Sequence, residues 1–456
     1  MLSAKQKQQV LHYGQGHLLE MAARGPIDKQ ASFEQELATL NFAELHRLFE
    51  QSRQKETTLD LSRSASPPII RLADLESDST ARMMGEGALH TGRIAVIMVA
   101  GGQGTRLGHD APKGTYPIGP VTDRSLFQIH AEKVLALSRR YETQIPLLIM
   151  TSLENDAATQ RFFAEQRWFG LDQDQVIFFM QGMLPALDAV TGQVLLKAPG
   201  ELALSPNGHG GIIEALHRAG LLDRLESKGI TDCFYFQVDN PLVKIADPVF
   251  VGHHLIADAQ LSLKVLAKLY PLERMGNVVE LNGRYRIIEY TELPKELAEE
   301  TLPNGQLRIW AGSPAIHLFQ LKFLQKLGRG EITLPYHIAH KTVSYVDQTG
   351  QLVKPDKPNA LKFERFVFDA LPLAERVVAV ETSRKEEFEP LKNAEGEHSP
   401  ERVRQAMSDH YGGWLKEAGV AVPETHLVEV SPLVAIEARH LEEHETLEGK
   451  WVSKPQ

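Results

Sequence analysis

Cysteine is nearly absent from this chain, which has Cys233 alone among its 456 residues. A single thiol cannot form an internal disulfide, and it excludes a metal site built from several cysteines. The run Cys233–Phe236 is apolar, which favours a buried, inert thiol over a nucleophile. The chemistry of this protein is therefore expected to rest on other residue types.

Long apolar runs are also missing. No segment reaches the roughly 18 apolar residues that a membrane helix needs. The first residues lack the basic-then-apolar layout of a signal peptide. These two absences predict a cytoplasmic protein with no membrane partner.

Positive charge is in the minority, with 49 Lys and Arg against 59 Asp and Glu and a net charge of −10. This balance opposes general binding to nucleic acid or to an acidic membrane surface. A polyanionic ligand would have to meet a local cluster of cations. The composition, 43% hydrophobic and 24% charged, is that of a globular protein, and its oligomeric state, monomer or homo-oligomer, is left open.

The length predicts about two or three domains. We expect a helical N-terminal region over 1–88, which ends in an extended linker rich in serine, proline and acidic residues from about residue 58. From 89 to 370 apolar strands alternate with helices, which predicts an α/β domain with a Rossmann-like, mostly parallel sheet. Residues 371–456 are expected to form a small C-terminal subdomain without identifiable chemistry.

The most informative stretch runs from Ile94 to Lys113. Its first part, Ile94–Val99, is apolar and rich in β-branched residues, as in a strand buried on both faces. A glycine-rich turn follows, in which successive backbone N–H groups can form a concavity for an anion such as phosphate. Arg106 and Lys113 add two cations to the same loop. Together these features predict a phosphate-binding loop.

Two common glycine motifs do not match this loop. A P-loop requires a glycine before its lysine and a serine or threonine after it, whereas Lys113 stands between Pro112 and Gly114. The dinucleotide fingerprint requires a third glycine where this chain has Leu107. A dehydrogenase is therefore disfavoured, and a solvated surface turn remains the plain alternative.

The loop AGGQGTRLG, followed by Pro112-Lys113, resembles the signature of the UDP-sugar pyrophosphorylases, and of the UDP-N-acetylglucosamine pyrophosphorylases most of all. Further segments match that family in the same order: FFMQGMLPAL (178–187), SPNGHGG (205–211), FQVDNPLVKIADP (236–248), IIEYTEL (287–293), AGSPAIHLF (311–319), LPYHIAHKTV (334–343) and LKFERFVFD (361–369). The resemblance spans about residues 90–370.

This resemblance implies a uridylyltransferase that forms UDP-sugar and pyrophosphate from UTP and a sugar-1-phosphate. Such a step needs alignment of the reactants and neutralisation of phosphate charge. Arg106 and Lys113 suit that role, and Lys362 matches a family lysine that reaches the phosphates. Asp239 follows an apolar strand and is the candidate ligand for Mg²⁺, which polyphosphate chemistry usually requires. Without the resemblance, Lys362 would be read as a solvated strand lysine.

The nucleotide contacts implied by the resemblance are mostly backbone and amide groups. Ala100, Gly101 and Gly102 match the loop next to the base, and the Gln181 amide can pair with the edge of uracil. Gly208 matches a position where the backbone lies against the nucleoside, and Asp239 is also assigned to this nucleotide site.

Sugar recognition is where this chain departs from the family pattern. Glu289 matches a sugar-contacting acid. His209 stands where the acetylglucosamine enzymes typically have asparagine, and Ser313-Pro314 stands in place of their Asn-Ile. We expect N-acetylglucosamine-1-phosphate as the substrate. The alternatives are glucose-1-phosphate, galactose-1-phosphate or a broad sugar range, and a nucleotide-sugar-binding protein without turnover.

Overall fold

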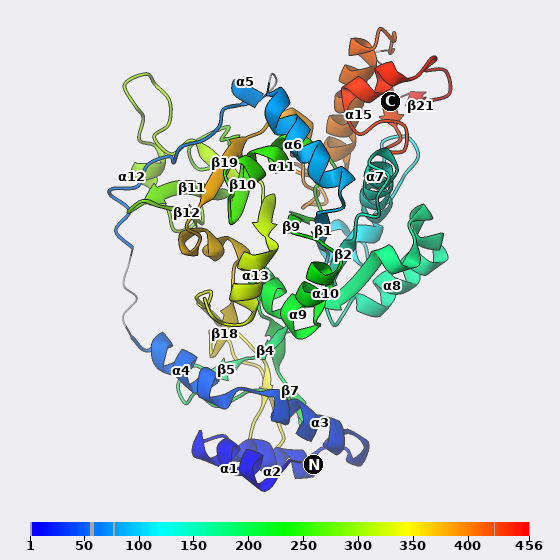
Figure 1. The fold of residues 1–456 in the computed structure, drawn as a ribbon. Helices are drawn as coiled ribbons and strands as arrows, with labels where there is room; N and C mark the ends of the chain where they lie inside the picture. Colours follow the sequence, from blue (N-terminus) through cyan, green and yellow to red (C-terminus); the bar gives the residue numbers. More distant parts are fainter. Residues whose placement is uncertain (1, 55–58, 76–77, 424, 456) are drawn as a thin grey trace. The chain divides into compact units, whose positions relative to one another are not determined.

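The computed structural model describes residues 2–54, 59–75, 78–423 and 425–455 (Figure 1). The chain divides into two compact units. Unit 1 contains residues 1–60, 182–212 and 334–367, and unit 2 contains residues 61–181, 213–333 and 368–456. The domain boundaries expected at residues 88 and 370 remain a prediction.

Unit 2 is built on a ten-stranded mixed sheet, in the order β12-β11-β13-β10-β14-β9-β1-β2-β3, with β19 paired to β10. The strands β9, β1, β2 and β3 run parallel, and so do β10 and β19, whereas the other pairs are antiparallel. The α/β class is thus confirmed, although the sheet is mixed and only partly parallel where a mostly parallel one was expected. The Rossmann-like parallel part carries the predicted phosphate loop. The strands are β1 (Ile94–Val99), β2 (Leu147–Thr151), β3 (Val176–Met180), β9 (Asp232–Gln237), β10 (Leu261–Ala267), β11 (Gly276–Leu281), β12 (Arg284–Ile288), β13 (Ala311–Ser313), β14 (His317–Gln320) and β19 (Val377–Glu381).

Helices pack on this sheet because they present apolar faces to it. Helix α7 begins after Ser125, whose hydroxyl accepts the N–H of Gln128 at 3.1 Å. Strand β1 is buried along nearly its whole length, and Cys233 of β9 is buried as predicted, with the pKa of its thiol raised by burial. The helices between the strands are α7 (Leu126–Arg140), α8 (Asp156–Glu165), α9 (Ile212–Arg218), α10 (Leu221–Ser227), α11 (Pro248–Ile256), α12 (Lys295–Ala298) and α13 (Leu321–Gly328).

The prediction of an extended linker is wrong over most of the second half of that segment, from about residue 72 onward. Residues 58, 76 and 77 lie outside the described residues, but α5 (Leu72–Leu75) and α6 (Ser79–His90) are helical. Helix α6 lies against α11 (Figure 1), and a Cβ on Gly85 would come within 1.9 Å of the carbonyl oxygen of Pro248. A Cβ on Gly252 of α11 would come equally close, at 1.8 Å, to the carbonyl of Ala81. This close packing of two backbones stabilises a helix that composition alone did not indicate.

Unit 1 combines N-terminal helices with short strands around one apolar core, which includes Leu18, Phe33, Leu48, Leu361 and Phe363. The helices are α1 (Ala4–His12), α2 (Gly16–Arg24), α3 (Ile27–Thr39) and α4 (Phe42–Ser52). The strands are β4 (Met183–Pro185), β5 (Leu187–Asp188), β6 (Leu196–Ala198), β7 (Glu201–Leu202), β8 (Leu204–Pro206), β15 (His337–Lys341), β16 (Tyr345–Val346), β17 (Leu352–Val353) and β18 (Ala360–Glu364). The helical N-terminal region is confirmed.

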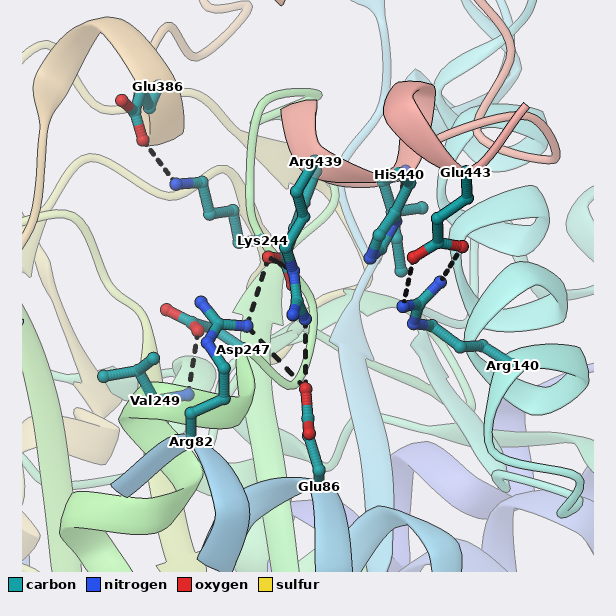
Figure 2. A network of polar contacts seen from close by, with 12 residues as sticks. Arg82, Glu86, Arg140, Lys244, Asp247, Val249, Glu386, Arg439, His440 and Glu443 are labelled. Carbon is teal, nitrogen blue, oxygen red and sulfur yellow. Dashed lines mark hydrogen bonds and ion pairs between the residues drawn. The ribbon is translucent and has the colours of Figure 1, made fainter. Parts of the chain in front are cut away.

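The C-terminal part of the chain folds as part of unit 2. It contains α14 (Arg384–Glu387), α15 (Pro400–Glu417), β20 (His426–Val430) and β21 (Trp451–Pro455). A short 3₁₀ segment, Ala438–Glu443, is tied to α6 and α7 by ion pairs (Figure 2): Arg439 with Glu86 at 3.0 Å, and Arg140 with Glu443 at 2.7 Å. Within the described part of the chain, every helix is too short or too polar to cross a bilayer.

Candidate active site

The phosphate loop starts where β1 ends and is held by a buried side chain, Asn155. The Nδ2 atom of Asn155 donates to the carbonyl oxygens of Ala100 at 2.9 Å and Gly102 at 3.3 Å. Its Oδ1 accepts the N–H of Ser152 at 2.8 Å. Asn155 has no exposed surface. The sequence reasoning missed this residue, although a short polar residue just after an apolar strand is the same signal that marked Asp239.

The loop folds back on itself through backbone hydrogen bonds. The N–H of Gly104 donates to Ala111 at 2.9 Å, and the N–H of Lys113 donates to Gly102 at 3.1 Å. A Cβ on Gly104 would lie 2.8 Å from the carbonyl oxygen of His109. Glycine is therefore required at position 104 for the loop to close.

Part of the loop backbone is available to a ligand. Among the described residues, the N–H groups of Gly101, Gly102 and Gln103 have no hydrogen-bond acceptor. A Cβ added to Gly102 would meet no atom within 4 Å. Successive unbonded N–H groups in an open turn form the kind of concavity that binds anions.

Lys113 lies between two oxygen acceptors. Its Nζ atom is 3.6 Å from Oδ2 of Asp239 and 3.3 Å from the carbonyl oxygen of Leu391. The structure thus brings together the loop lysine and the carboxylate that follows β9. Arg106 is exposed, and its guanidinium has no ionic partner among the described residues.

Gln181 follows β3 and lies beside Gly101. Its N–H donates to Thr151 at 2.8 Å, and its Oε1 would be 3.3 Å from a Cβ on Gly101. The parallel strands β9, β1 and β3 end at the same edge of the sheet. Asp239, Gly101 and Gln181 each follow one of these strands, and ligands of such sheets bind at that edge.

The two predicted sugar contacts of unit 2 lie on either side of a glycine. A Cβ on Gly276 would be 4.0 Å from both Oε1 of Glu289 and Cβ of Ser313, but only 2.5 Å from Cγ2 of Ile287, whose side chain fills the space beside this glycine. Gly276 is paired with Ser313 in the β11–β13 ladder, so the two residues face the same side of the sheet. The hydroxyl of Ser313 accepts the N–H of Ala315 at 3.2 Å. No signal in the single sequence marked Gly276.

The other predicted residues, Gly208, His209 and Lys362, belong to unit 1. Gly208 has a φ of 80°, and a Cβ there would lie 2.3 Å from the carbonyl oxygen of Arg365. Only glycine fits both the conformation and the space.

His209 is held by the segment that follows β18. Its Nδ1 accepts the N–H of Val367 at 3.2 Å, and its ring stacks on Phe366 at 5.3 Å. Burial, followed by the charge of His337, lowers the pKa of His209 to about 4. The imidazole is therefore neutral at pH 7 and acts through hydrogen bonds.

Lys362 lies in the middle of β18, paired with Ala339 of β15. Its neighbours Leu361 and Phe363 are buried in the core of unit 1, and strand alternation places Lys362 on the opposite face. Among the described residues its ammonium has no hydrogen-bonding or ionic partner. The cation is consequently available to an anionic ligand.

The described residues contain no group of three or more His, Cys, Asp or Glu side chains that could hold a metal ion by themselves. Asp239 is a single, largely buried carboxylate beside the phosphate loop. One such ligand suits Mg²⁺, which keeps several waters and binds substrate phosphates. The donor set therefore fits a metal that arrives with the nucleotide.

The chain is similar to known proteins over most of its length. A family model described as UTP–glucose-1-phosphate uridylyltransferase (UDPGP) matches residues 39–455. The UDP-N-acetylhexosamine pyrophosphorylase-like protein 1 of Xenopus tropicalis is 39% identical over 379 residues, which cover 77% of this chain and 74% of that protein. The UDP-N-acetylglucosamine pyrophosphorylase of Saccharomyces cerevisiae is 39% identical over 368 residues, covering 78% and 77%.

A solved structure extends the similarity to the fold. The uridine diphosphate N-acetylglucosamine pyrophosphorylase of Trypanosoma brucei, in complex with inhibitor, has a TM-score of 0.82 and 27% identity, and the match covers 97% of this chain and 95% of that one. The family resemblance of the sequence motifs is thereby confirmed. The chain belongs to the UDPGP family and is a UTP:sugar-1-phosphate uridylyltransferase, a UDP-sugar pyrophosphorylase.

Proposed function

We propose that this UDP-sugar pyrophosphorylase uses N-acetylglucosamine-1-phosphate as its main sugar substrate. Two relatives that are 39% identical to this chain are named for N-acetylglucosamine or N-acetylhexosamine. The observation that carries the proposal is the placement of Glu289 and Ser313 on either side of Gly276, each 4.0 Å from the position of a Cβ there. The carboxylate and the hydroxyl offer polar partners to a substituent of the sugar.

The reaction is in-line attack of a sugar-phosphate oxygen on the α-phosphorus of UTP, with pyrophosphate as the leaving group. The unbonded N–H groups of the loop bind phosphate oxygens, and Arg106 and Lys113 neutralise the charge that develops on pyrophosphate. Lys362, whose ammonium has no partner in the described part of the chain, supplies a further charge to the phosphates. These groups align and stabilise; none of them forms a covalent intermediate.

Asp239 is the proposed protein ligand of Mg²⁺. The bound cation would neutralise phosphate charge. Uracil is recognised by the backbone of Ala100, Gly101 and Gly102, by the Gln181 amide and by the backbone at Gly208. A cytoplasmic location remains a prediction from the sequence.

Discrimination against glucose-1-phosphate is proposed to be weaker than the resemblance to the UDP-N-acetylglucosamine pyrophosphorylases alone suggests. Ser313 has no amide to offer an N-acetyl group, and Pro314 has no N–H. His209 has one ring nitrogen occupied by the Val367 N–H. Fewer partners for the acetamido group mean less difference between N-acetylglucosamine-1-phosphate and glucose-1-phosphate.

The test is a panel of sugar-1-phosphates with UTP and Mg²⁺, scored by pyrophosphate release. We expect the highest kcat/KM with N-acetylglucosamine-1-phosphate and measurable turnover with glucose-1-phosphate. A higher kcat/KM with glucose- or galactose-1-phosphate would overturn the sugar assignment. Binding of UDP-sugar without pyrophosphate release from any substrate would instead favour a non-catalytic binding protein.

A further inference from the structure

The segment Glu387–Leu391 contacts the turn that carries Asp239. The N–H of Leu391 donates to the carbonyl oxygen of Asp239 at 2.8 Å, and the carbonyl of Leu391 accepts the ammonium of Lys113 at 3.3 Å. One residue of this segment therefore contacts both a proposed phosphate-binding cation and the backbone of the proposed metal ligand. Composition assigned no chemistry to this part of the chain.

Asn240 links the turn to that segment through its side chain. Its Nδ2 donates to the carbonyl oxygen of Glu387 at 2.6 Å, and its Oδ1 accepts the N–H of Glu389 at 3.3 Å and of Leu242 at 3.3 Å. The side chain is buried, with 4% of the residue exposed. A carboxamide is the side chain that can donate and accept in this way at once.

The two ends of this connection are anchored independently of Asn240. Glu387 binds the ammonium of Lys264 with both oxygens at 2.7 Å, and Lys244 pairs with Glu386 (Figure 2). Lys133 of α7 donates to the carbonyls of Pro241 at 2.6 Å and Val243 at 2.8 Å. Loss of the Asn240 side chain therefore leaves both the turn and the segment attached to the core.

We propose that Asn240 is a positioning residue for uridylyl transfer, because its carboxamide holds Glu387–Leu391 on the Asp239 turn and so sets the place of the Lys113 ammonium. The inference rests on the proposed role of Lys113 in the transfer step. Asn240 itself touches no reacting atom. Its effect is expected on the rate of the bound complex more than on substrate binding, since a displaced cation is missed most in the transition state.

Two variants test this role. In Asn240→Asp, an oxygen faces the Glu387 carbonyl in place of the donor, and Asn240→Ala removes the contacts without adding charge. Each is expected to lower kcat by about ten- to a hundredfold, with the KM for UTP changed by less than about threefold. In a Lys113→Ala background the same substitutions should lower kcat by less than about twofold, because the cation they place is already gone.

Amide hydrogen exchange gives a readout that does not depend on activity. Faster exchange at Glu389 and Leu391 is expected in both variants, because their amides donate to this turn. The matched control is Asn359→Asp. The Asn359 side chain also bonds backbone groups: its Nδ2 donates to the carbonyl oxygen of Val343 at 3.1 Å, and its Oδ1 accepts the N–H of Val343 at 2.9 Å. The control should leave kcat and the exchange at Leu391 unchanged.

Equal losses of kcat in the parent and Lys113→Ala backgrounds would overturn the proposal, as would unchanged exchange at Leu391. If only one of the two Asn240 variants folds, the kcat and the amide exchange of that variant decide whether the proposal holds. A Lys113→Ala enzyme with normal kcat would remove the proposed role of Lys113 and this inference with it. The parent enzyme would still release pyrophosphate in that case, so a failure of this inference can be distinguished from a failure of the proposed function.

Discussion

The ammonium of Lys113 lies 3.6 Å from the carboxylate oxygen Oδ2 of Asp239, which joins the phosphate loop after β1 to the turn after β9. The two strands are parallel neighbours, so their carboxyl ends meet. Opposite charges at this distance hold each other in place before a substrate arrives. The pair gives the proposed chemistry a cation for phosphate oxygens and a carboxylate for a divalent metal.

The first prediction concerns the loop cations. Arg106→Ala and Lys113→Ala should each lower turnover about a hundred- to thousandfold, because each loses about 3–4 kcal/mol of transition-state stabilisation. Initial rates of pyrophosphate release measure the effect. Arg139→Ala and Lys228→Ala, at exposed positions, are the controls and should keep the parent rate. Near-normal turnover in both loop variants would mean that the loop is only a surface turn.

The second prediction separates transition-state contacts from binding contacts. Lys362→Ala and Asp239→Asn should lower kcat far more than they weaken UDP-sugar binding, since charge neutralisation matters most in the transition state. Calorimetry and initial rates on the same preparations give both numbers. Lys341→Ala changes an exposed lysine of the neighbouring strand β15 and should change neither. Parallel losses in binding and rate would show that these residues serve binding alone.

The third prediction concerns sugar choice. Ser313→Asn should raise the ratio of kcat/KM for N-acetylglucosamine-1-phosphate over glucose-1-phosphate, because the amide can pair with the acetamido group. An unpaired buried polar group costs about 1–3 kcal/mol, so the ratio should rise about five- to a hundredfold. Ser227→Asn, at the exposed C-terminal end of α10, should leave the ratio unchanged. A parent enzyme that already prefers the acetylated sugar by several orders of magnitude would contradict the argument from Ser313.

The fourth prediction concerns acid stability. Burial, opposed in part by a hydrogen bond to Val238, lowers the pKa of His130 to about 3, and the charge of Lys133 adds to the shift. Burial also lowers the pKa of His410 to about 3 and that of His440 to about 4. The unfolded chain binds protons at these positions below about pH 6.5, whereas the folded chain does not. The free energy of unfolding should therefore fall as the pH drops from about 6.5 to 4.

Denaturant unfolding at a series of pH values measures this fall, at about 1.4 kcal/mol per pH unit for each buried histidine. His130→Asn should reduce the slope of unfolding free energy against pH by up to about 1.4 kcal/mol per pH unit, the contribution of one proton. His12→Asn, at an exposed position, should not change this slope. An unchanged slope in the first variant would mean that His130 takes up its proton in the folded state.

Local patterns of the sequence predicted much of this fold. The apolar run Ile94–Val99 became β1 as expected, and the Ser125 cap opens α7. The hydroxyl of Ser399 caps α15 in the same way. These features depend on neighbours a few residues apart, where alternation, burial and capping act. The family resemblance then indicated the residues of the site.

Contacts between distant segments were decided by tertiary structure alone. Asn155 holds the Ala100 carbonyl, Gly276 lies between Glu289 and Ser313, and the carbonyl of Leu391 meets Lys113. Helix α6 exists where composition suggested a linker, because glycines let it pack closely on α11. The sequence by itself determined which residues carry charge and which strands are buried. Only the folded chain decided their partners, since strand order and the packing of backbones bring together groups that no local pattern connects.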